Sequence, residues 1–269
     1  MWQTPGQRDH LSGDMNKMMH GMRQEDLAGV IDHSLLRPDA TYTDLKASCE
    51  EAQQFGFYSI CIHPGFVRKA KDLLKDTDVR ITVVIGFPLG MALTDVKVYE
   101  AMNASLDGAD EIDMVINIGA LKSGDWKTVR KDIADVLAAT KERIHKTIIE
   151  TCYLDNSEKT KVIEIALDAG SEFIKTSTGF GSVGAKTEDV RLIKSIVGDA
   201  AGIKAAGGIS TLAQVLEMLE AGATRIGTSA GVKILKELGK NTEGTLSLKN
   251  INVKRERASE GRKSIKRKD

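Results

Sequence analysis

Short apolar runs rich in Val and Ile alternate along the chain with longer segments whose apolar residues recur at helical spacing. Such runs are typical of buried strands, and such spacing is typical of amphipathic helices. The candidate strands are 29–33 (GVIDH), 58–62 (YSICI), 80–86 (RITVVIG), 111–117 (EIDMVIN), 146–151 (KTIIET), 173–177 (FIKTS), 202–208 (GIKAAGG) and 225–229 (RIGTS). Helical segments such as 94–106 (TDVKVYEAMNASL) and 186–197 (KTEDVRLIKSIV) lie between them. The pattern predicts repeated strand–helix units and a parallel sheet.

The units are evenly spaced, because the first and last candidate strands begin 196 residues apart, which is 28 residues per unit. Three similar segments, DGADEID (107–113), DAGSEFIK (168–175) and EAGATRIG (220–227), place a glycine between a helix and the next strand. Glycine adopts the left-handed conformation that ends a helix at little cost. An open, doubly wound sheet uses the same local signals. Eight even units without GxGxxG after the first strand favour closure, so we predict an α/β fold with a single parallel (β/α)8 TIM barrel.

The repeat occupies the middle of the chain. It predicts a barrel domain over 25–239, an N-terminal extension over 1–24 and a basic, flexible C-terminal tail over 240–269. Basic and acidic residues balance over the whole chain at 38 each, but 249–269 holds nine basic and three acidic side chains. A partner-binding or nucleic-acid-binding tail on an inactive barrel is the alternative. No aromatic residues lie between these charges, so we favour a solvated tail and expect no nucleic-acid partner.

The number and spacing of the cysteines and histidines indicate the cellular compartment and bear on metal binding. The three cysteines form no CxxC pair, which indicates a reducing compartment, and no apolar stretch approaches the ~18 residues of a membrane span. We therefore expect a cytoplasmic protein without a membrane partner. None of the five histidines stands at HxH or HxxxH spacing, so we expect no metal site and no cofactor.

Charged residues lie on strands that a barrel buries on both faces. They are Asp32, Asp113, Lys146, Glu150, Lys175 and Lys204. A buried charge costs several kcal/mol unless it is paired, and replacing such pairs by apolar residues is often neutral or stabilising. The two-residue period points Lys175 and Lys204 inward from neighbouring strands. A single buried Lys–Asp pair could equally well be a structural ion pair that only stabilises the barrel. For all six charged residues together, we favour a functional site.

Two neighbouring lysines and a carboxylate suit Schiff-base chemistry. A lysine attacks a carbonyl as the neutral amine, and fewer than about one free lysine in a thousand is neutral at neutral pH. A second ammonium about 4 to 6 Å away disfavours the charged form by roughly 3 to 4 kcal/mol. Lys204 is placed to be that neighbour of Lys175. Asp113 is then a candidate for proton transfer.

Glycines follow the last three strands, in TGFGS (178–182), AGGIS (206–210) and GTSAG (227–231). The loops after the late strands of a TIM barrel often bind phosphate through backbone amides. One glycine pair is usually only a turn, but three at the same end of consecutive strands predict a phosphate site.

The motifs FIKTSTGF, IKAAGGI, GADEIDMVINIG, IDHSLL, SICIHPGFV and IIET together resemble the 2-deoxyribose-5-phosphate aldolase family over about residues 26 to 238. The resemblance implies metal-independent, class I cleavage of 2-deoxy-D-ribose 5-phosphate to D-glyceraldehyde 3-phosphate and acetaldehyde in deoxynucleoside catabolism. By position, Lys175 matches the Schiff-base lysine, Lys204 the second lysine that lowers its pKa, and Asp113 the proton-transfer acid. The residues that match phosphate-binding positions are Gly179, Gly207, Gly208, Gly227 and Ser229.

Other positions complete the predicted site or depart from the family. Asp32, Ser34, Cys61 and Lys146 are candidates for the pocket, with Cys61 favoured as a core residue. Some family members carry Lys where Phe180 stands and Arg where Ser210 stands, so phosphate binding here is expected to depend more on backbone amides. The expected partners are a phosphorylated sugar and aldehydes, and a homodimer is one option for the assembly. Another Schiff-base barrel, such as a transaldolase or a keto-acid aldolase, is the rival enzyme.

Overall fold

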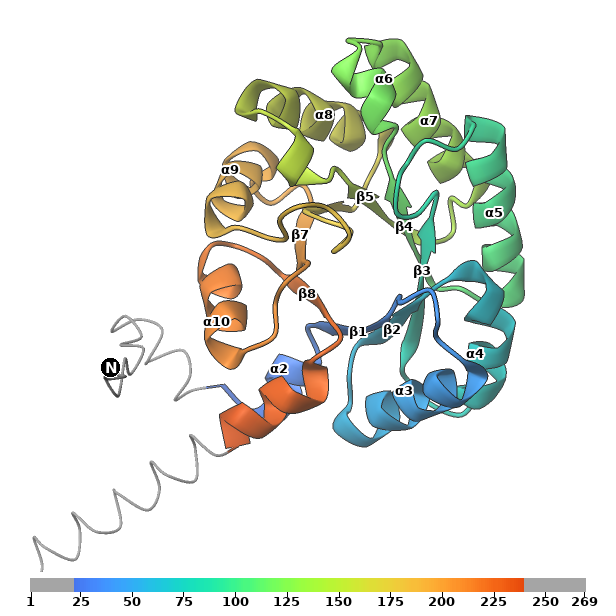
Figure 1. Cartoon of the computed structure of the whole chain (residues 1–269), viewed down its shortest axis with the longest axis vertical. Helices are drawn as coiled ribbons and strands as arrows, with labels where there is room; N and C mark the ends of the chain where they lie inside the picture. The colour runs from blue at the N-terminus through green and yellow to red at the C-terminus, as the bar shows by residue number, and fades with distance from the viewer. Residues whose placement is uncertain (1–21, 240–269) are drawn as a thin grey trace, which may run out of the picture.

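Eight parallel strands close into one barrel in the computed structural model, which describes residues 22–239 (Figure 1). The strands are β1 (Ile31–Leu35), β2 (Ser59–Ile62), β3 (Arg80–Ile85), β4 (Glu111–Val115), β5 (Ile144–Ile148), β6 (Phe173–Lys175), β7 (Gly202–Ala206) and β8 (Arg225–Thr228). They pair in chain order, and β1 also pairs with β8. The predicted single (β/α)8 TIM barrel is confirmed.

Helices surround the barrel and connect consecutive strands (Figure 1). They are α2 (Gln24–Ala28), α3 (Tyr42–Phe55), α4 (Val67–Leu73), α5 (Thr94–Asp107), α6 (Ile118–Lys122), α7 (Trp126–Ala139), α8 (Asn156–Ala169), α9 (Thr187–Val197) and α10 (Leu212–Glu220), with 3-10 turns η1 (Pro64–Phe66) and η2 (Thr151–Tyr153). Residues 231–239 are also helical and lie beside α2, where Gln24 Nε2 donates to the carbonyl oxygen of Leu235 at 3.3 Å.

The predicted element boundaries hold to within a few residues. β5 begins two residues earlier than expected, and β6 is only three residues long. Gly108 and Gly170 end α5 and α8 in the left-handed region, with φ of 110° and 97°. The third repeat differs, because Ala221 ends α10 in a right-handed conformation and Gly222 adopts the positive φ one residue later.

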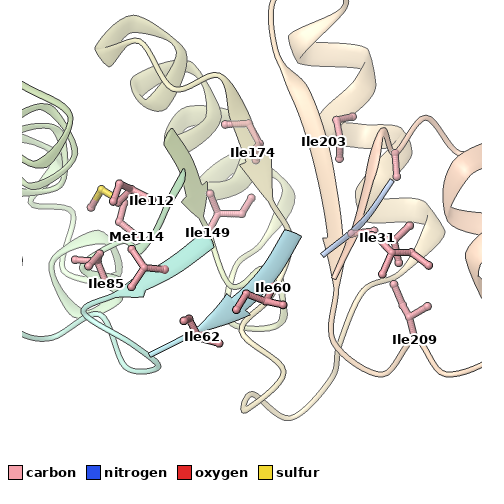
Figure 2. Packing of buried hydrophobic residues seen from close by; sticks show 14 of the residues in the cluster. Ile31, Ile60, Ile62, Ile85, Ile112, Met114, Ile149, Ile174, Ile203 and Ile209 are labelled. Atoms are coloured by element: carbon pink, nitrogen blue, oxygen red, sulfur yellow. The ribbon is translucent and has the colours of Figure 1, made fainter. Parts of the chain in front are cut away.

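Alternation along each strand separates an apolar shell from a charged interior. On β4, Ile112 and Met114 belong to the buried hydrophobic cluster, whereas Glu111 and Asp113 alternate with them and carry buried charges. Figure 2 shows side chains of this cluster, including Ile112 and Ile174, extending from the strands. The apolar packing between strands and helices therefore holds the barrel in shape, and the buried charges lie on the inward face of the strands.

The predicted N-terminal extension (1–24) and basic tail (240–269) lie almost wholly outside the described residues. Within residues 22–239, no helix is long and apolar enough to cross a membrane.

Candidate active site

Three buried lysines converge on Asp113 inside the barrel. Lys146 on β5 contacts Asp113 Oδ1 through its Nζ at 2.7 Å, while the Nζ atoms of Lys175 on β6 and Lys204 on β7 both contact Oδ2, at 2.8 and 2.7 Å. The strand register explains this meeting, because Asp113 pairs with Lys146 across β4 and β5, and Lys175 pairs with Lys204 across β6 and β7. The sequence prediction that Lys175 and Lys204 lie on adjacent strands and point inward is confirmed.

Asp32 on β1 joins the network through Lys204 on β7 and Arg225 on β8. Its Oδ2 lies 2.5 Å from Lys204 Nζ, and its Oδ1 lies 2.9 Å from Arg225 Nη1. Ser59 Oγ donates to the same Oδ1 at 2.8 Å. Lys204 is therefore held between two carboxylates.

A second charged layer, Glu111 and Arg225, lies beneath this network and was not identified from the sequence. Glu111 Oε2 lies 2.5 Å from Lys146 Nζ and 3.1 Å from Arg225 Nη1, and its Oε1 accepts a hydrogen bond from Tyr58 Oη at 3.0 Å. The two-residue period of a strand could have predicted the position of Glu111, because it puts Glu111 on the same face of β4 as Asp113.

The interior holds one more cation than carboxylates, since Lys146, Lys175, Lys204 and Arg225 face Asp32, Glu111 and Asp113. Burial alone would raise the pKa of Asp113, but the three lysines outweigh it and hold that pKa well below its usual range. Burial opposes the charge of Lys204, yet Asp113 and Asp32 raise its pKa above the ordinary value. The pKa of Asp32 falls to about 2 against its own burial, chiefly because of Lys204. Asp113, Lys204 and Asp32 are therefore ionised at neutral pH.

A cavity of 570 Å³ opens at the carboxyl ends of the strands. Its walls come from β1 and from the loops after β6, β7 and β8. Lys175 contributes to its lining, whereas Lys146, Lys204 and Asp113 lie behind it with no exposed surface. Of the three lysines on Asp113, only Lys175 therefore faces a space that can hold a ligand.

A family model for DeoC/LacD family aldolases matches residues 15–251. The chain belongs to the DeoC/LacD family of aldolases. It is therefore an enzyme that makes or breaks a carbon–carbon bond.

Curated relatives and solved structures agree with this membership. The chain is 54% identical over 219 residues to a deoxyribose-phosphate aldolase of Thermococcus kodakarensis, covering 80% of this chain and 98% of the relative. It is 52% identical over 216 residues to that of Carboxydothermus hydrogenoformans, covering 79% and 95%. The structure named "QR15, an Aldolase" has a TM-score of 0.77 at 40% identity, covering 80% and 96% of the two chains. A deoxyribose phosphate aldolase from Aeropyrum pernix, described as tetrameric, has a TM-score of 0.78 at 30% identity, covering 87% and 99%.

In this aldolase the glycine-containing loops lie along one wall of the cavity. The residues in its lining include Gly179, Gly207, Gly208, Gly227 and Ser229. Gly179, Gly207 and Gly208 adopt positive φ values of 91°, 90° and 76°. Within residues 22–239, the backbone N–H groups of Gly179, Gly208 and Ser229 donate to no protein acceptor. These amides are thus free to bind an anion.

The loops after β6 and β7 pack against each other backbone to backbone. A Cβ atom on Gly184 would lie 2.1 Å from the carbonyl oxygen of Gly207, and Ala185 N–H donates to that same oxygen at 3.0 Å. Only glycine fits such an approach.

The two positions that depart from some family members both line the cavity. Phe180 is half-exposed and packs edge to face on Phe87, with 5.4 Å between ring centroids. Ser210 donates its backbone N–H to Gln214 Oε1 at 2.9 Å and accepts from Lys233 Nζ at its carbonyl at 3.0 Å. Lys233 thus contacts the backbone of Ser210 but is not among the residues that line the cavity.

The remaining predicted pocket residues differ in their access to the cavity. Ser34 lines it and donates its hydroxyl to the carbonyl of Asp32 at 3.2 Å. Cys61 does not line it: the side chain is fully buried, and its Sγ lies 3.9 Å from Lys204 Nζ. Burial raises the pKa of the Cys61 thiol, which favours the uncharged form. Asp32 and Lys146 act within the buried network rather than at the cavity surface.

His33 and Glu51 also line the cavity, although sequence reasoning did not select them. His33 Nε2 lies 2.8 Å from Glu51 Oε2, and the imidazole stacks on Phe57 at 4.9 Å. Burial lowers the pKa of His33, opposed by its contact with Glu51. The sequence IDHSLL places His33 one residue after Asp32, but the pattern alone assigns it to the opposite face of β1.

No group of three or more His, Cys, Asp or Glu side chains in residues 22–239 is arranged to hold a metal ion.

Proposed function

We propose that this aldolase reversibly cleaves 2-deoxy-D-ribose 5-phosphate to D-glyceraldehyde 3-phosphate and acetaldehyde through a Schiff base on Lys175. The observation that carries the proposal is that Lys175 shares Asp113 with Lys204 and alone among the three lysines on that carboxylate lines the cavity. The names of the relatives support the substrate. We place the reaction in deoxynucleoside catabolism and, from the cysteine usage, in the cytoplasm.

The chemistry begins with attack of the neutral Lys175 amine on C1 of the open-chain sugar. The carbinolamine loses water to give an iminium ion, which then accepts the electron pair of the C2–C3 bond as the C3 hydroxyl loses its proton. Glyceraldehyde 3-phosphate leaves, and the enamine on Lys175 takes up a proton at C2. Addition of water to the resulting iminium ion releases acetaldehyde and restores the amine.

Asp113 and Lys204 have complementary roles in these proton transfers. Asp113 is ionised, so it enters the cycle as a proton acceptor rather than as an acid. Lys204 is an ammonium whose Nζ contacts the same carboxylate oxygen as Lys175. Its positive charge disfavours a second ammonium beside it, and loss of the Lys175 proton brings the charged interior to neutrality.

We assign the phosphate to the wall formed by the loops after β6, β7 and β8. The free amides of Gly179, Gly208 and Ser229 supply donors there. Neither Phe180 nor Ser210 supplies a charge, so backbone donors and the open space beside Gly208 accommodate the group. The reacting end of the sugar then lies toward Lys175.

Borohydride reduction tests the covalent step. Incubation with acetaldehyde or with the sugar phosphate, followed by borohydride, should add the mass of the substrate fragment to the peptide that contains Lys175. Lys175→Arg should abolish both the adduct and turnover. An adduct on Lys204 or Lys146, with Lys175→Arg still active, would contradict the assignment.

We also propose that two copies of the chain associate through α5. Val96, Tyr99, Met102 and Leu106 are exposed along one side of this helix, and the preceding loop adds exposed Leu89, Met91 and Leu93. Exposed apolar side chains that gather on one surface are typical of a protein–protein contact. The tetrameric description of the Aeropyrum pernix protein is consistent with self-association.

Light scattering after size exclusion measures this association. Leu106→Glu should shift the particle toward the monomer, because it places a charge within an apolar contact. Ser195→Glu adds the same charge to an exposed position of α9 and serves as the control. A monomeric wild-type protein, or equal behaviour of both variants, would exclude the α5 interface.

A further inference from the structure

Glu150 has a strained backbone. Within residues 22–239 it is the single non-glycine residue with positive φ, at φ 49° and ψ 69°. L-residues rarely adopt this region, and such strain persists where surrounding contacts enforce it. Glu150 follows β5 and precedes η2, so it lies at the end of the barrel where the cavity opens. None of the catalytic steps above uses it.

The buried carboxylate of Glu150 is directed at one residue of the loop after β6. Both of its oxygens accept from the backbone N–H of Thr178, each at 3.2 Å, and the hydroxyl of Thr178 donates to Oε2. The side chain is almost fully buried. Charge-assisted hydrogen bonds of this kind are stronger than neutral ones, and a buried carboxylate needs them.

Thr178 connects Glu150 to the cavity wall. Its hydroxyl accepts a hydrogen bond from the backbone N–H of Phe180 at 3.0 Å, which closes a tight turn around Gly179. Residues 178–180 line the cavity. Gly181 packs directly on the anchor, because a Cβ atom there would lie 2.7 Å from Cys152 Sγ and 3.3 Å from Glu150 Cδ. The turn is therefore fixed from behind, with the N–H of Gly179 left unpaired.

We propose that Glu150 is a positioning residue for the phosphate end of the substrate. It holds the turn over residues 178–181 through Thr178, so that the amide of Gly179 is aimed before the ligand binds. The inference depends on the proposed function for the identity of the substrate. Strain at φ 49° is tolerated because the left-handed backbone lets the carboxylate reach back to the neighbouring loop.

The direction in which Glu150→Gln changes phosphate affinity distinguishes a positioning role from a simple electrostatic one. Glu150→Gln removes a negative charge near the phosphate wall, so electrostatics alone would strengthen phosphate binding. Loss of the anchor instead loosens the turn and weakens binding, because the amide donors must be ordered when the ligand arrives. We therefore expect the neutral variant to bind phosphate less well despite its more favourable charge.

Steady-state kinetics with 2-deoxyribose 5-phosphate and 2-deoxyribose measure this effect. For Glu150→Gln we expect KM for the phosphorylated sugar to rise about ten-fold while kcat changes less than about two-fold. Thr178→Val removes the hydroxyl that bridges Glu150 and the Phe180 N–H and should raise KM in the same direction. Because both variants weaken the contact between Glu150 and Thr178, the double variant should lose less than the sum of the two single variants. Thr178→Ser keeps the hydroxyl and should restore the wild-type KM. Glu164→Gln, an exposed change on α8, is the matched control.

Equal losses of kcat/KM for both sugars in Glu150→Gln would mean a merely structural role and would overturn the proposal, as would an unchanged or lower KM for the phosphorylated sugar. Should Glu150→Gln fail to fold, as judged by circular dichroism, the comparison of Thr178→Val with Thr178→Ser decides the question. If the wild-type enzyme cleaves neither sugar, the proposed function fails. Calorimetric titration with inorganic phosphate then tests the turn by itself, with about ten-fold weaker binding expected for Thr178→Val.

Discussion

Removal of the positive charge of Lys204 gives the most direct test of the buried network. The Nζ atoms of Lys204 and Lys175 contact the same oxygen of Asp113 at 2.7 and 2.8 Å. Two ammonium groups on one oxygen can therefore lie no farther apart than about 5.5 Å, and they repel each other by at least about 3 kcal/mol at an effective dielectric of ~20. That energy corresponds to roughly a hundred-fold change in the protonation equilibrium of the amine.

Lys204→Met also changes the charge balance of the interior. Three cations then face three carboxylates, so the protonated form of Lys175 completes the balance instead of exceeding it. The attacking amine becomes scarcer for this reason too. We expect kcat/KM at neutral pH to fall by about 10²-fold or more.

The dependence on pH distinguishes this charge effect from other roles. Asp113 and Asp32 raise the pKa of Lys204 above its ordinary value, so in the wild-type enzyme Lys204 stays charged up to at least about pH 9. In Lys204→Met the rate should instead recover as the pH rises, by up to about ten-fold per pH unit. Lys204→Arg keeps the charge and should retain the wild-type shape of the profile.

The assay is kcat/KM between about pH 6 and 9, followed through the release of glyceraldehyde 3-phosphate, with circular dichroism to confirm folding. A profile for Lys204→Met that runs parallel to the wild type, lower by a constant factor, would show that the charge of Lys204 does not promote loss of the Lys175 proton.

Four further outcomes are expected. Ser210→Arg should lower KM for the phosphorylated sugar and leave 2-deoxyribose nearly unchanged, because it adds a charged donor beside the glycine loops; equal effects on both sugars would place the phosphate elsewhere. EDTA should leave turnover intact, since the Schiff-base route needs no metal, and a loss restored by a divalent ion would refute this. Lys97→Met should cost about 3 to 5 kcal/mol in chemical denaturation, because it leaves the buried Asp132 carboxylate without its 2.5 Å partner, and adding Asp132→Leu should recover most of that. Asp32 and Asp113 have lower pKa values in the folded protein than the ~3.9 of an unfolded chain, so their ionisation stabilises the fold. This contribution is complete above the unfolded pKa and is lost as the pH falls toward the folded pKa values. The melting temperature should therefore drop below about pH 4.

Local sequence patterns determined the architecture and part of the site. Eight evenly spaced strands separated by helices predict a parallel sheet and favour a closed barrel over an open sheet, and the structure confirms the closure. Consecutive strands of such a barrel pair with each other, so Lys175 and Lys204 had to be neighbours once their strands were identified. The two-residue period then fixed which face each residue occupies.

Only the tertiary structure decided how these charges combine. The two-residue period predicts that Lys146, Lys175 and Lys204 point inward. How deep each side chain lies along the barrel axis depends on strand tilt and register. In the structure all three contact Asp113, and only Lys175 lines the cavity. Arg225 and Glu111 lie on opposite sides of the barrel, so their contact follows from its closure and not from any local pattern. The positive φ of Glu150 likewise accompanies a contact with Thr178, 28 residues later, and no local sequence window predicts that contact because the partners meet only after β5 and β6 have paired.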